Sequence, residues 1–549
     1  MVLASLVAAA PGWTVPRVTP DRHDALADYV RGRAADDLGE LDVAARSFAS
    51  AYQADPGDST LALRTFRQAV TAGDMALAFR TAHALDATRS LPPDGTMLLF
   101  AEAVQRKDWK RADALAYRID AQKLFAFSTP VLRAWIGLAR RRSDPAALID
   151  RAQASPLAAS YAVEHRVLLL FAGPDPTAGV AALSALNLPQ GARVVRLRIA
   201  AAAALAKRGK RDDAQKLLVG DDPATARARE TLAAGRKLPG AIDTAQAGIA
   251  DLFARIATDV DREQAGTLAL EFARAATFLD PADSAGWLAT ASLLVGKGDT
   301  DAALAALARV PADDPFAGTA SDARLALLVR AGRKDEALAE AKAAVDAANP
   351  RAADWSRYGD MLSERQRYAD AAQAYARAVA VSGPGIAPGD AWPLLLQQAN
   401  SQLQAGDWPG ARVTAGRALA VSPDQPATLN FLGYSELDHG GDVTAATALI
   451  AKASALAPDD PSITDSLGWS WYLRGDLARA VPLLEQAARG APAETEINEH
   501  LGDAYWRAGR RLEARYAWRA ALVAAEPDRR KRIEAKIDGG LAAPAPLRL

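Results

Sequence analysis

A regular spacing of glycines constrains this chain more than any other feature of its sequence. Glycines at intervals of 34, 35 and 34 residues mark successive units: Gly406, Gly440, Gly475 and Gly509. A Leu-Gly pair precedes three of these glycines by the same distance, at Leu432, Leu467 and Leu501. Self-similarity at such a period is typical of stacked structural units that cannot fold singly. With 549 residues, the chain also exceeds the roughly 250 to 300 residues that one hydrophobic core supports.

Each unit is long enough for two helices. The unit from Pro461 to Pro492 reads PSITDSLGWSWYLRGDLARAVPLLEQAARGAP. Small residues at Gly468 and Ala480 allow two helices to approach closely, while large residues such as Trp471 fill the space between pairs. Aromatic residues make up only 6% of the chain and Ala-rich runs are frequent, which favours helix over sheet. We therefore expect an all-α fold in which helix pairs stack into an α-solenoid.

These units resemble the tetratricopeptide repeat family, in which 34 residues form a helix, a turn and a second helix. The same spacing recurs in the middle of the chain, where Gly298 and Gly332 are 34 residues apart. The resemblance implies a right-handed superhelix whose concave side is lined by the first helix of each pair. It also implies that the protein binds other proteins and is not an enzyme.

The repeat varies in clarity along the chain and suggests several segments. The motifs fade between Ser128 and Pro239, and a segment rich in Gly and Pro from Ser382 to Trp392 predicts a loop or hinge. A boundary between a weaker and a stronger half falls near Pro239. The expected segments are a signal-peptide remnant or disordered N-terminus (1–20), N-terminal repeats (21–127), divergent helical repeats (128–239), central repeats (240–383), C-terminal repeats with an aromatic groove (384–527), and a charged capping helix with a disordered tail (528–549).

Composition argues against several classes of function. Lys and Arg number 65 and Asp and Glu 66, so the chain lacks the positive field that nucleic acid binding requires. The absence of Cys excludes disulfides and thiolate chemistry. No window holds the roughly 18 apolar residues of a membrane span. The five histidines are scattered and no metal, phosphate-binding or nucleophile motif is present, so we predict no catalytic residue, metal or cofactor.

The register of the repeats predicts a groove that binds a partner. In each unit, the residue two before the Leu of the Leu-Gly pair and those one, four and five after the Gly face the concave side. The predicted groove residues are Asn400, Asn430, Tyr434, Asp465, Trp469, Tyr472, Asp503, Trp506 and Arg507. This surface offers almost no Lys, so we do not expect it to grip a terminal carboxylate.

The aromatic residues of this groove have two interpretations. Trp469, Tyr472 and Trp506 lie opposite the packing side of their helices, where a ring has no expected partner inside the protein, and exposed rings of this kind suit peptide binding. Aromatic residues at helical spacing are more often part of a core than of a binding site, so the two interpretations carry about equal weight here. Trp471 and Trp518 stand at packing positions, where the core interpretation is favoured.

Two longer stretches resemble a set of bacterial periplasmic tetratricopeptide proteins, some of which are lipid-anchored adaptors that deliver hydrolases to a carboxyl-terminal processing protease. They run from Gly248 to Pro281 and from Ile463 to Ala487. The apolar start, Met1 to Ala10, resembles the end of a secretory signal but lacks its Lys or Arg, and the chain lacks the Cys for lipid attachment.

This resemblance implies a scaffold in the cell envelope, periplasmic or associated with the outer membrane, whose partners are a periplasmic protease and its substrates. Two alternatives remain. One is a cytoplasmic assembly scaffold, and the other is an enzyme with an unrecognised site between Ser128 and Pro239. The sequence leaves the oligomeric state open.

Overall fold

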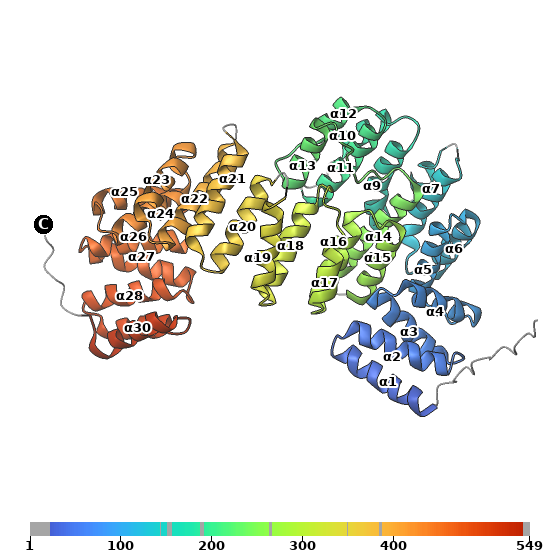
Figure 1. The fold of residues 1–549 in the computed structure, drawn as a ribbon, viewed down its shortest axis with the longest axis horizontal. Coiled ribbons are helices and arrows are strands. Elements are labelled where there is room, and N and C mark those ends of the chain that lie inside the picture. The colour runs from blue at the N-terminus through green and yellow to red at the C-terminus, as the bar shows by residue number, and fades with distance from the viewer. Residues whose placement is uncertain are drawn as a thin grey trace, which may run out of the picture. The chain divides into compact units, whose positions relative to one another are not determined.

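The computed structural model describes residues 22–142, 144–150, 156–186, 191–262, 266–347, 350–383 and 387–541. Within these ranges the regular structure consists of thirty α-helices and one short 3-10 helix, without a strand (Figure 1). The predicted all-α solenoid is therefore confirmed. The predicted signal remnant and most of the predicted tail lie outside the described residues.

The chain divides into two compact units, residues 1–331 and 332–549, called unit 1 and unit 2 below. Unit 1 contains α1 (Arg22–Asp37), α2 (Leu41–Ala54), α3 (Ser59–Ala72), α4 (Met75–Ala87), α5 (Pro93–Gln105), α6 (Trp109–Gln122), η1 (Ala126–Ser128), α7 (Thr129–Ala139), α8 (Ala147–Asp150), α9 (Pro156–Ala172), α10 (Thr177–Ala185), α11 (Ala192–Lys207), α12 (Arg211–Leu217), α13 (Pro223–Ala233), α14 (Ala245–Arg262), α15 (Gly266–Leu279), α16 (Ser284–Gly296), α17 (Thr300–Leu307) and α18 (Ala317–Arg330).

Unit 2 contains α19 (Lys334–Val345), α20 (Ala352–Glu364), α21 (Tyr368–Ser382), α22 (Pro388–Gln404), α23 (Trp408–Val421), α24 (Pro426–Asp438), α25 (Val443–Leu456), α26 (Pro461–Leu473), α27 (Leu477–Gly490), α28 (Thr495–Arg507), α29 (Arg511–Ala521) and α30 (Pro527–Gly539). From α20 to α29, each even-numbered helix pairs with the next, and each pair stacks on the following one. The helix α30 then packs against α29.

The helix pairs of unit 2 follow from the glycines of the sequence pattern. The turn glycines Gly406, Gly440, Gly475 and Gly509 have φ values between +71° and +82°, a conformation that costs other residues free energy. An added Cβ at Gly468 would lie 2.8 Å from Leu484 Cγ. The predicted turns and the predicted close approach of paired helices are therefore confirmed.

Aspartates that the sequence analysis did not single out begin several of the second helices. The side chains of Asp407, Asp442 and Asp476 accept hydrogen bonds from backbone N–H groups in the first turns of α23, α25 and α27. Such caps satisfy donors that a helix N-terminus otherwise leaves unpaired and stabilise a helix by about 1 kcal/mol each. A turn glycine followed closely by Asp thus ends one helix and starts the next.

The Gly- and Pro-rich segment between Ser382 and Trp392 corrects one prediction. The sequence indicated no helix there, but α22 begins at Pro388 and includes Trp392. Proline fits the first turn of a helix because the N–H it lacks would have no intrahelical acceptor there. Pro388 therefore starts α22.

Unit 1 has a feature absent from the sequence prediction: its helices pack across long distances in the chain. The described part of the divergent region, 128–239, forms helix pairs such as α9 with α10 and α11 with α12. The next pair turns back, so that α15 packs against α3 and α5, and α14 against α7 and α9 (Figure 1). The division of the chain therefore falls after Ala331, not near Pro239, because helices on both sides of Pro239 pack together.

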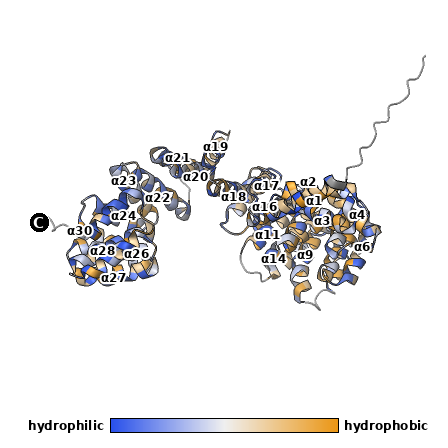
Figure 2. Ribbon diagram, turned by 90° about the horizontal axis from the view of Figure 1, so that it is seen from below, coloured by the Kyte–Doolittle hydropathy of each residue, from blue (hydrophilic) through white to orange (hydrophobic). Residues whose placement is uncertain are grey.

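Aromatic rings fill the inner side of unit 1. The ring of Phe253 on α14 lies 6.4 Å from Phe100, and that of Phe272 on α15 lies 5.2 Å from Phe125, between ring centroids. Phe253 and Phe272 also contact each other. These contacts bury apolar surface, which is the main favourable contribution to folding. Figure 2 shows hydrophobic and hydrophilic residues mixed along the helices, as expected for helices that bury one side and expose the other.

Ion pairs at the edge of this core hold α14 to its neighbours. Arg196 of α11 lies 2.7 Å from a carboxylate oxygen of Asp251 on α14, and Arg255 of α14 lies 2.7 Å from one of Glu164 on α9. His165, fully buried on α9, accepts a hydrogen bond at Nδ1 from Trp135 Nε1, 3.2 Å away. The inner side of unit 1 is thus occupied by its own helices α14 and α15.

Candidate protein-binding face

The predicted groove residues lie on the first helices of the repeats in unit 2. Asn400 is on α22, while Asn430 and Tyr434 are on α24. The remaining six are on α26 (Asp465, Trp469 and Tyr472) and on α28 (Asp503, Trp506 and Arg507). We call these nine residues, together with Asp438, Glu496, Glu499 and His500, the inner face of unit 2. Among the described residues, no hydrogen bond or ring contact joins Asn400 to the other predicted residues.

Trp469 lies on α26, which packs between α24 and α28, and has more contacts than the sequence indicated. Its ring stacks on His500, with centroids 4.0 Å apart and planes 13° apart, and on Tyr472 at 4.5 Å and 15°. Tyr472 is only 7% exposed. The argument that these two rings have no partner inside the protein is therefore wrong, because the next repeat brings His500 onto Trp469. Their role in binding a partner stays a prediction.

Trp506 and Trp518 lie together at the C-terminal end of unit 2, so the argument that the Trp506 ring has no partner inside the protein is also wrong. Their ring centroids are 5.5 Å apart, and Arg511 lies over the Trp506 ring at 5.0 Å. Trp518 is fully buried, as its packing position predicted, and its Nε1–H donates to Asp503 Oδ1 over 2.8 Å. Asp503, predicted to face the groove, therefore also supports the core.

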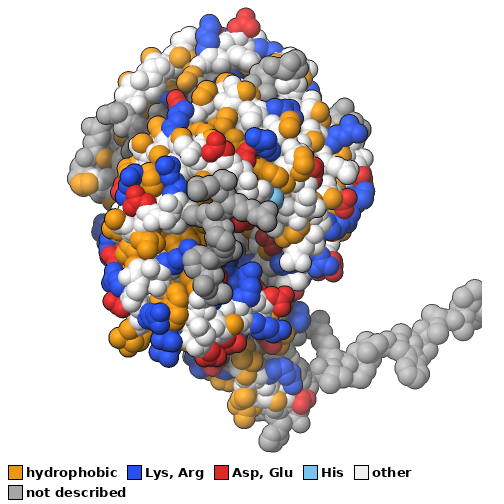
Figure 3. Space-filling view, turned by 90° about the vertical axis from the view of Figure 1, so that its left-hand side faces the viewer, with side chains coloured by type: hydrophobic (Ala, Val, Ile, Leu, Met, Phe, Trp, Pro, Cys, Tyr) orange, Lys and Arg blue, Asp and Glu red, His pale blue; other side chains and the backbone are white. Residues whose placement is uncertain are grey.

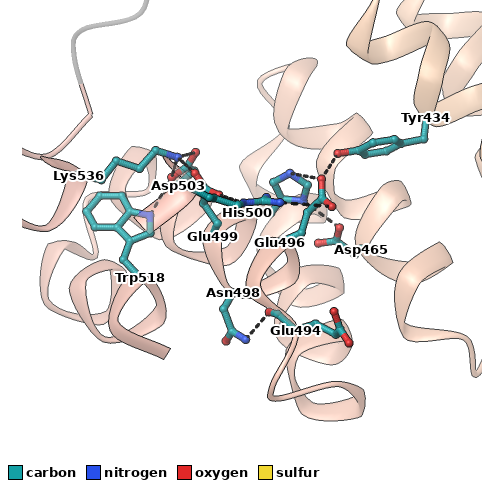
Figure 4. A network of polar contacts seen from close by, with 11 residues as sticks. Tyr434, Asp465, Glu494, Glu496, Asn498, Glu499, His500, Asp503, Trp518 and Lys536 are labelled. Carbon is teal, nitrogen blue, oxygen red and sulfur yellow. Dashed lines mark hydrogen bonds and ion pairs between the residues drawn. The ribbon is translucent and has the colours of Figure 1, made fainter. Parts of the chain in front are cut away.

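Hydrogen bonds connect α24, α26 and α28 across the inner face (Figure 4). The Tyr434 hydroxyl donates to Glu496 Oε1 at 2.6 Å, which joins α24 to α28, two repeats further along the chain. His500 Nδ1 lies 2.9 Å from Asp465 Oδ2. Both histidine and aspartate are buried here, whereas Glu496 is 47% exposed.

The helix α30 supplies the cations of this network. Lys536 Nζ lies 2.7 Å from Glu499 Oε1 and 2.7 Å from Asp503 Oδ2, and Arg529 Nε donates to Glu499 Oε2 at 2.7 Å (Figure 4). On the same helix, Ile533 is fully buried and packs with Trp518. The predicted charged capping helix is present, and it covers carboxylates as well as apolar surface.

Burial and neighbouring charges shift the pKa values of these groups in different directions. Burial alone would lower the pKa of His500, but the carboxylates of Asp465 and Glu496 raise it. Burial raises the pKa of Asp503 despite Lys536. Burial would also raise that of Glu499, but Lys536 and Arg529 lower it overall. Burial, assisted by the charge of Asp503, raises the pKa of Tyr472 to about 12.

The register of the repeats did not predict that His500, Arg529 and Lys536 belong to this face. His500 follows its Asp465 partner by 35 residues, and Arg529 and Lys536 stand seven residues apart on α30. The spacing of seven on a charged helix indicates one face, so it was a usable signal. No spacing, however, predicts which carboxylates that face meets.

Among the described residues, no group of three or more His, Asp or Glu could hold a metal ion, and no helix is long and apolar enough to cross a membrane. A cavity of about 730 Å³ in unit 1 opens between α11, α16 and the start of α18, with Val195, Leu288 and Phe316 in its lining. Figure 3 shows a surface where hydrophobic, basic and acidic side chains are mixed.

Stacked helix pairs whose first helices line an inner face define an α-solenoid of the protein-binding class. More particularly, residues 325–391, 396–461 and 467–529 match the tetratricopeptide repeat family. The chain carries tetratricopeptide repeats in these segments. The search among curated proteins found no match.

Solved structures of repeat proteins are similar to this chain. A thermophilic tetratricopeptide repeat protein of Thermus thermophilus is 22% identical, with 34% of this chain and 97% of that one covered at a TM-score of 0.30. A tetratricopeptide repeat protein of Parabacteroides merdae is 14% identical over 45% of this chain and 95% of its own, at 0.37. The Cut9–Hcn1 complex of the APC/C is 14% identical over 94% and 96%, also at 0.37.

Proposed function

We propose that the protein is a non-catalytic scaffold that binds segments of partner proteins on the inner face of unit 2. One observation carries the proposal: the inner side of unit 1 is filled by α14 and α15, whereas the inner face of unit 2 keeps exposed side chains at Asp438 and Arg507. Between them lie the half-buried rings of Tyr434, Trp469 and Trp506. Rings flanked by polar groups are typical of the centre of a binding site.

The test is affinity capture with cross-linking, using the full chain and an extract of the cells that produce it. The double substitution Asp438→Lys and Arg507→Glu reverses two exposed charges without removing a ring from the core. We expect it to reduce the yield of specific partners strongly, while helical content is unchanged.

The matched control is the same kind of charge reversal outside the inner face, at Arg519 on the second helix α29, which is also exposed. The variant Arg519→Glu should capture partners as the unmodified protein does. Equal capture by all three proteins would contradict the proposal.

We propose that the protein is located in the cell envelope. We propose that its partners there are a protease and the substrates of that protease. This rests on the two stretches that resemble periplasmic adaptors and on the signal-like segment Met1 to Ala10. Cell fractionation with an antibody against the chain tests it. Recovery in the periplasm or with the outer membrane supports the envelope role, and recovery in the cytosol supports the alternative of a cytoplasmic scaffold.

A further inference from the structure

Three successive repeats of unit 2 place a hydrogen-bond acceptor at the same position of the first helix. This position, two residues before the Leu of each Leu-Gly pair, holds Asn430 on α24, Asp465 on α26 and Glu499 on α28. Equivalent positions of stacked repeats lie in a row along the inner face. The three acceptors differ in how many hydrogen-bond donors contact them.

Glu499, the last of the row, receives donors on both carboxylate oxygens from one helix. Arg529 binds Oε2 and Lys536 binds Oε1, each at 2.7 Å, while Ile533 between them is fully buried. The three residues are four and three positions apart and so share one face of α30. The chain thus shows how a basic, amphipathic helix binds this face.

The two earlier acceptors in the row have oxygens without a donor. Asp465 Oδ1 and Asn430 Oδ1 are buried and receive no hydrogen bond from any described residue. Asp465 as a whole is only 4% exposed, and its other oxygen is taken by His500. A buried acceptor without a donor destabilises a protein by about 1 to 3 kcal/mol. Both oxygens are shielded from solvent, so a partner's donor recovers this free energy when neighbouring side chains of the face move aside to admit it.

The surroundings of these acceptors favour a cationic donor. Asp438 and Glu496 place further carboxylates at the rim, and both are exposed. The half-buried rings of Tyr434 and Trp469 lie on the same helices as the two acceptors. Long Lys and Arg side chains pack their stems along such rings while the charged head reaches a deeper acceptor.

We propose that the inner face of unit 2 at α24 and α26 binds a basic, Lys- and Arg-bearing helical segment of a partner protein, as α30 binds α28. This inference rests on the proposed function, because it names the chemistry of the partner for the same face. The partner segment extends the row of cations beyond α30 to Asp465 and Asn430. It binds beside α30 and does not displace it.

The segment α30 itself provides a defined probe. A fluorescent peptide with its sequence, PDRRKRIEAKIDG, is titrated against the full chain at low and at moderate salt. We expect saturable binding that weakens as salt rises, because charge pairs at a surface are screened. A second peptide, in which every Arg and Lys is replaced by Glu, should not bind.

Variants of the full chain locate the peptide. Asp438→Asn, at an exposed site, and Asp465→Asn, at the buried acceptor, should each weaken binding about tenfold, as expected for loss of one charge-assisted hydrogen bond. The matched control Glu485→Gln removes a carboxylate of α27 that pairs with Tyr505 and Arg510 outside the inner face. It should leave the affinity unchanged, and circular dichroism checks the fold of each variant.

Other outcomes would overturn the inference. These are no binding of the basic peptide, equal binding of the acidic one, or an affinity unaffected by Asp438→Asn in a folded protein. Binding that is lost in Glu499→Gln but retained in Asp465→Asn would mean that the peptide replaces α30. If the inner face captures a partner through an acidic segment, this inference fails while the proposed function stands.

Discussion

The two units of this protein consist of the same kind of helix pairs but differ in what occupies the inner side of the solenoid. In unit 1, α14 and α15 return to earlier helices and fill the inner side with Phe253, Phe272 and their partners. In unit 2, the inner face carries a network of carboxylates and rings, and only its end is covered by α30. A repeat architecture therefore does not by itself leave a groove open, because helices from a later part of the chain can return and occupy it.

The largest loss of stability should come from removing an aromatic ring from the apolar inner side of unit 1. Phe253 is fully buried and contacts Phe100 and Phe272. We expect Phe253→Ala to lower the free energy of unfolding by about 3 to 5 kcal/mol, because it leaves a cavity. Urea unfolding followed by circular dichroism measures this. Tyr516→Ala, at a 60% exposed ring of unit 2, is the control and should change stability by less than about 0.5 kcal/mol.

The buried histidines of the two units should respond to pH in opposite directions. Burial lowers the pKa of His165 to about 4, so between pH 4 and about 6.5 only the unfolded chain binds a proton there. Stability should fall by up to about 3 kcal/mol as pH is lowered through this range. His500 has a raised pKa, so its contribution is full below about pH 6.5 and is lost as pH rises through its folded pKa.

Urea unfolding from pH 4 to 8 measures both effects. His165→Asn keeps an acceptor for Trp135 and should abolish the loss of stability at low pH. His500→Asn keeps a donor for Asp465 and should abolish the loss on the high-pH side. The same pH profile in both variants and the unmodified chain would mean that these histidines do not distinguish the units.

The helix α30, which covers the end of unit 2, provides the next test. Lys536 pairs with Glu499 and Asp503, whose side chains are 10% and 9% exposed. Lys536→Met should lower the free energy of unfolding by about 2 kcal/mol, because both carboxylates lose a charged donor in a poorly solvated place. The exposed Lys531 of the same helix is the control, and Lys531→Met should have almost no effect. Equal stability of the two variants would contradict the role of Lys536.

The smallest change in stability should come from substitutions at glycines that set the spacing of paired helices. A Cβ at Gly468 would lie 2.8 Å from Leu484 Cγ, whereas at Gly416, on α23, it would meet nothing within 4 Å. Gly468→Ala should destabilise unit 2 by about 1 kcal/mol. Gly416→Ala should stabilise it by about 0.5 to 1 kcal/mol, since Ala favours helix. Thermal unfolding compares them, and the same melting temperature in both variants would contradict the register of the repeats.

Much of the fold could be predicted because each repeat specifies its own turn and helix packing through residues that are close in the sequence. The glycines at Gly440 and Gly475 and the small residue at Gly468 specify turns and close helix packing within a single unit. The return of α14 onto α7 and α9 could not be predicted, because it depends on contacts between residues about a hundred or more positions apart. A period of 34 carries no information about such contacts.

The inner face was predictable in position but not in detail. The register placed Tyr434, Trp469 and Asp503 on the first helices, where they lie. It did not show that Trp469 stacks on His500 or that Asp503 binds Trp518 and Lys536, because these contacts depend on how closely neighbouring repeats approach. The register of the repeats thus predicts the position of a face, and the structure shows which of its side chains already have partners.

Site-specific photo-cross-linking tests the central claim most directly, namely that partners meet the inner face of unit 2. A photoreactive amino acid replaces Asp438 or Arg507 on that face, or the exposed Val413 or Tyr516 on the second helices α23 and α29. In the cells that produce the protein, we expect the same partner proteins to be cross-linked from 438 and 507 and not from 413 and 516. Cross-links to the same partners from 413 and 516 alone would contradict the account.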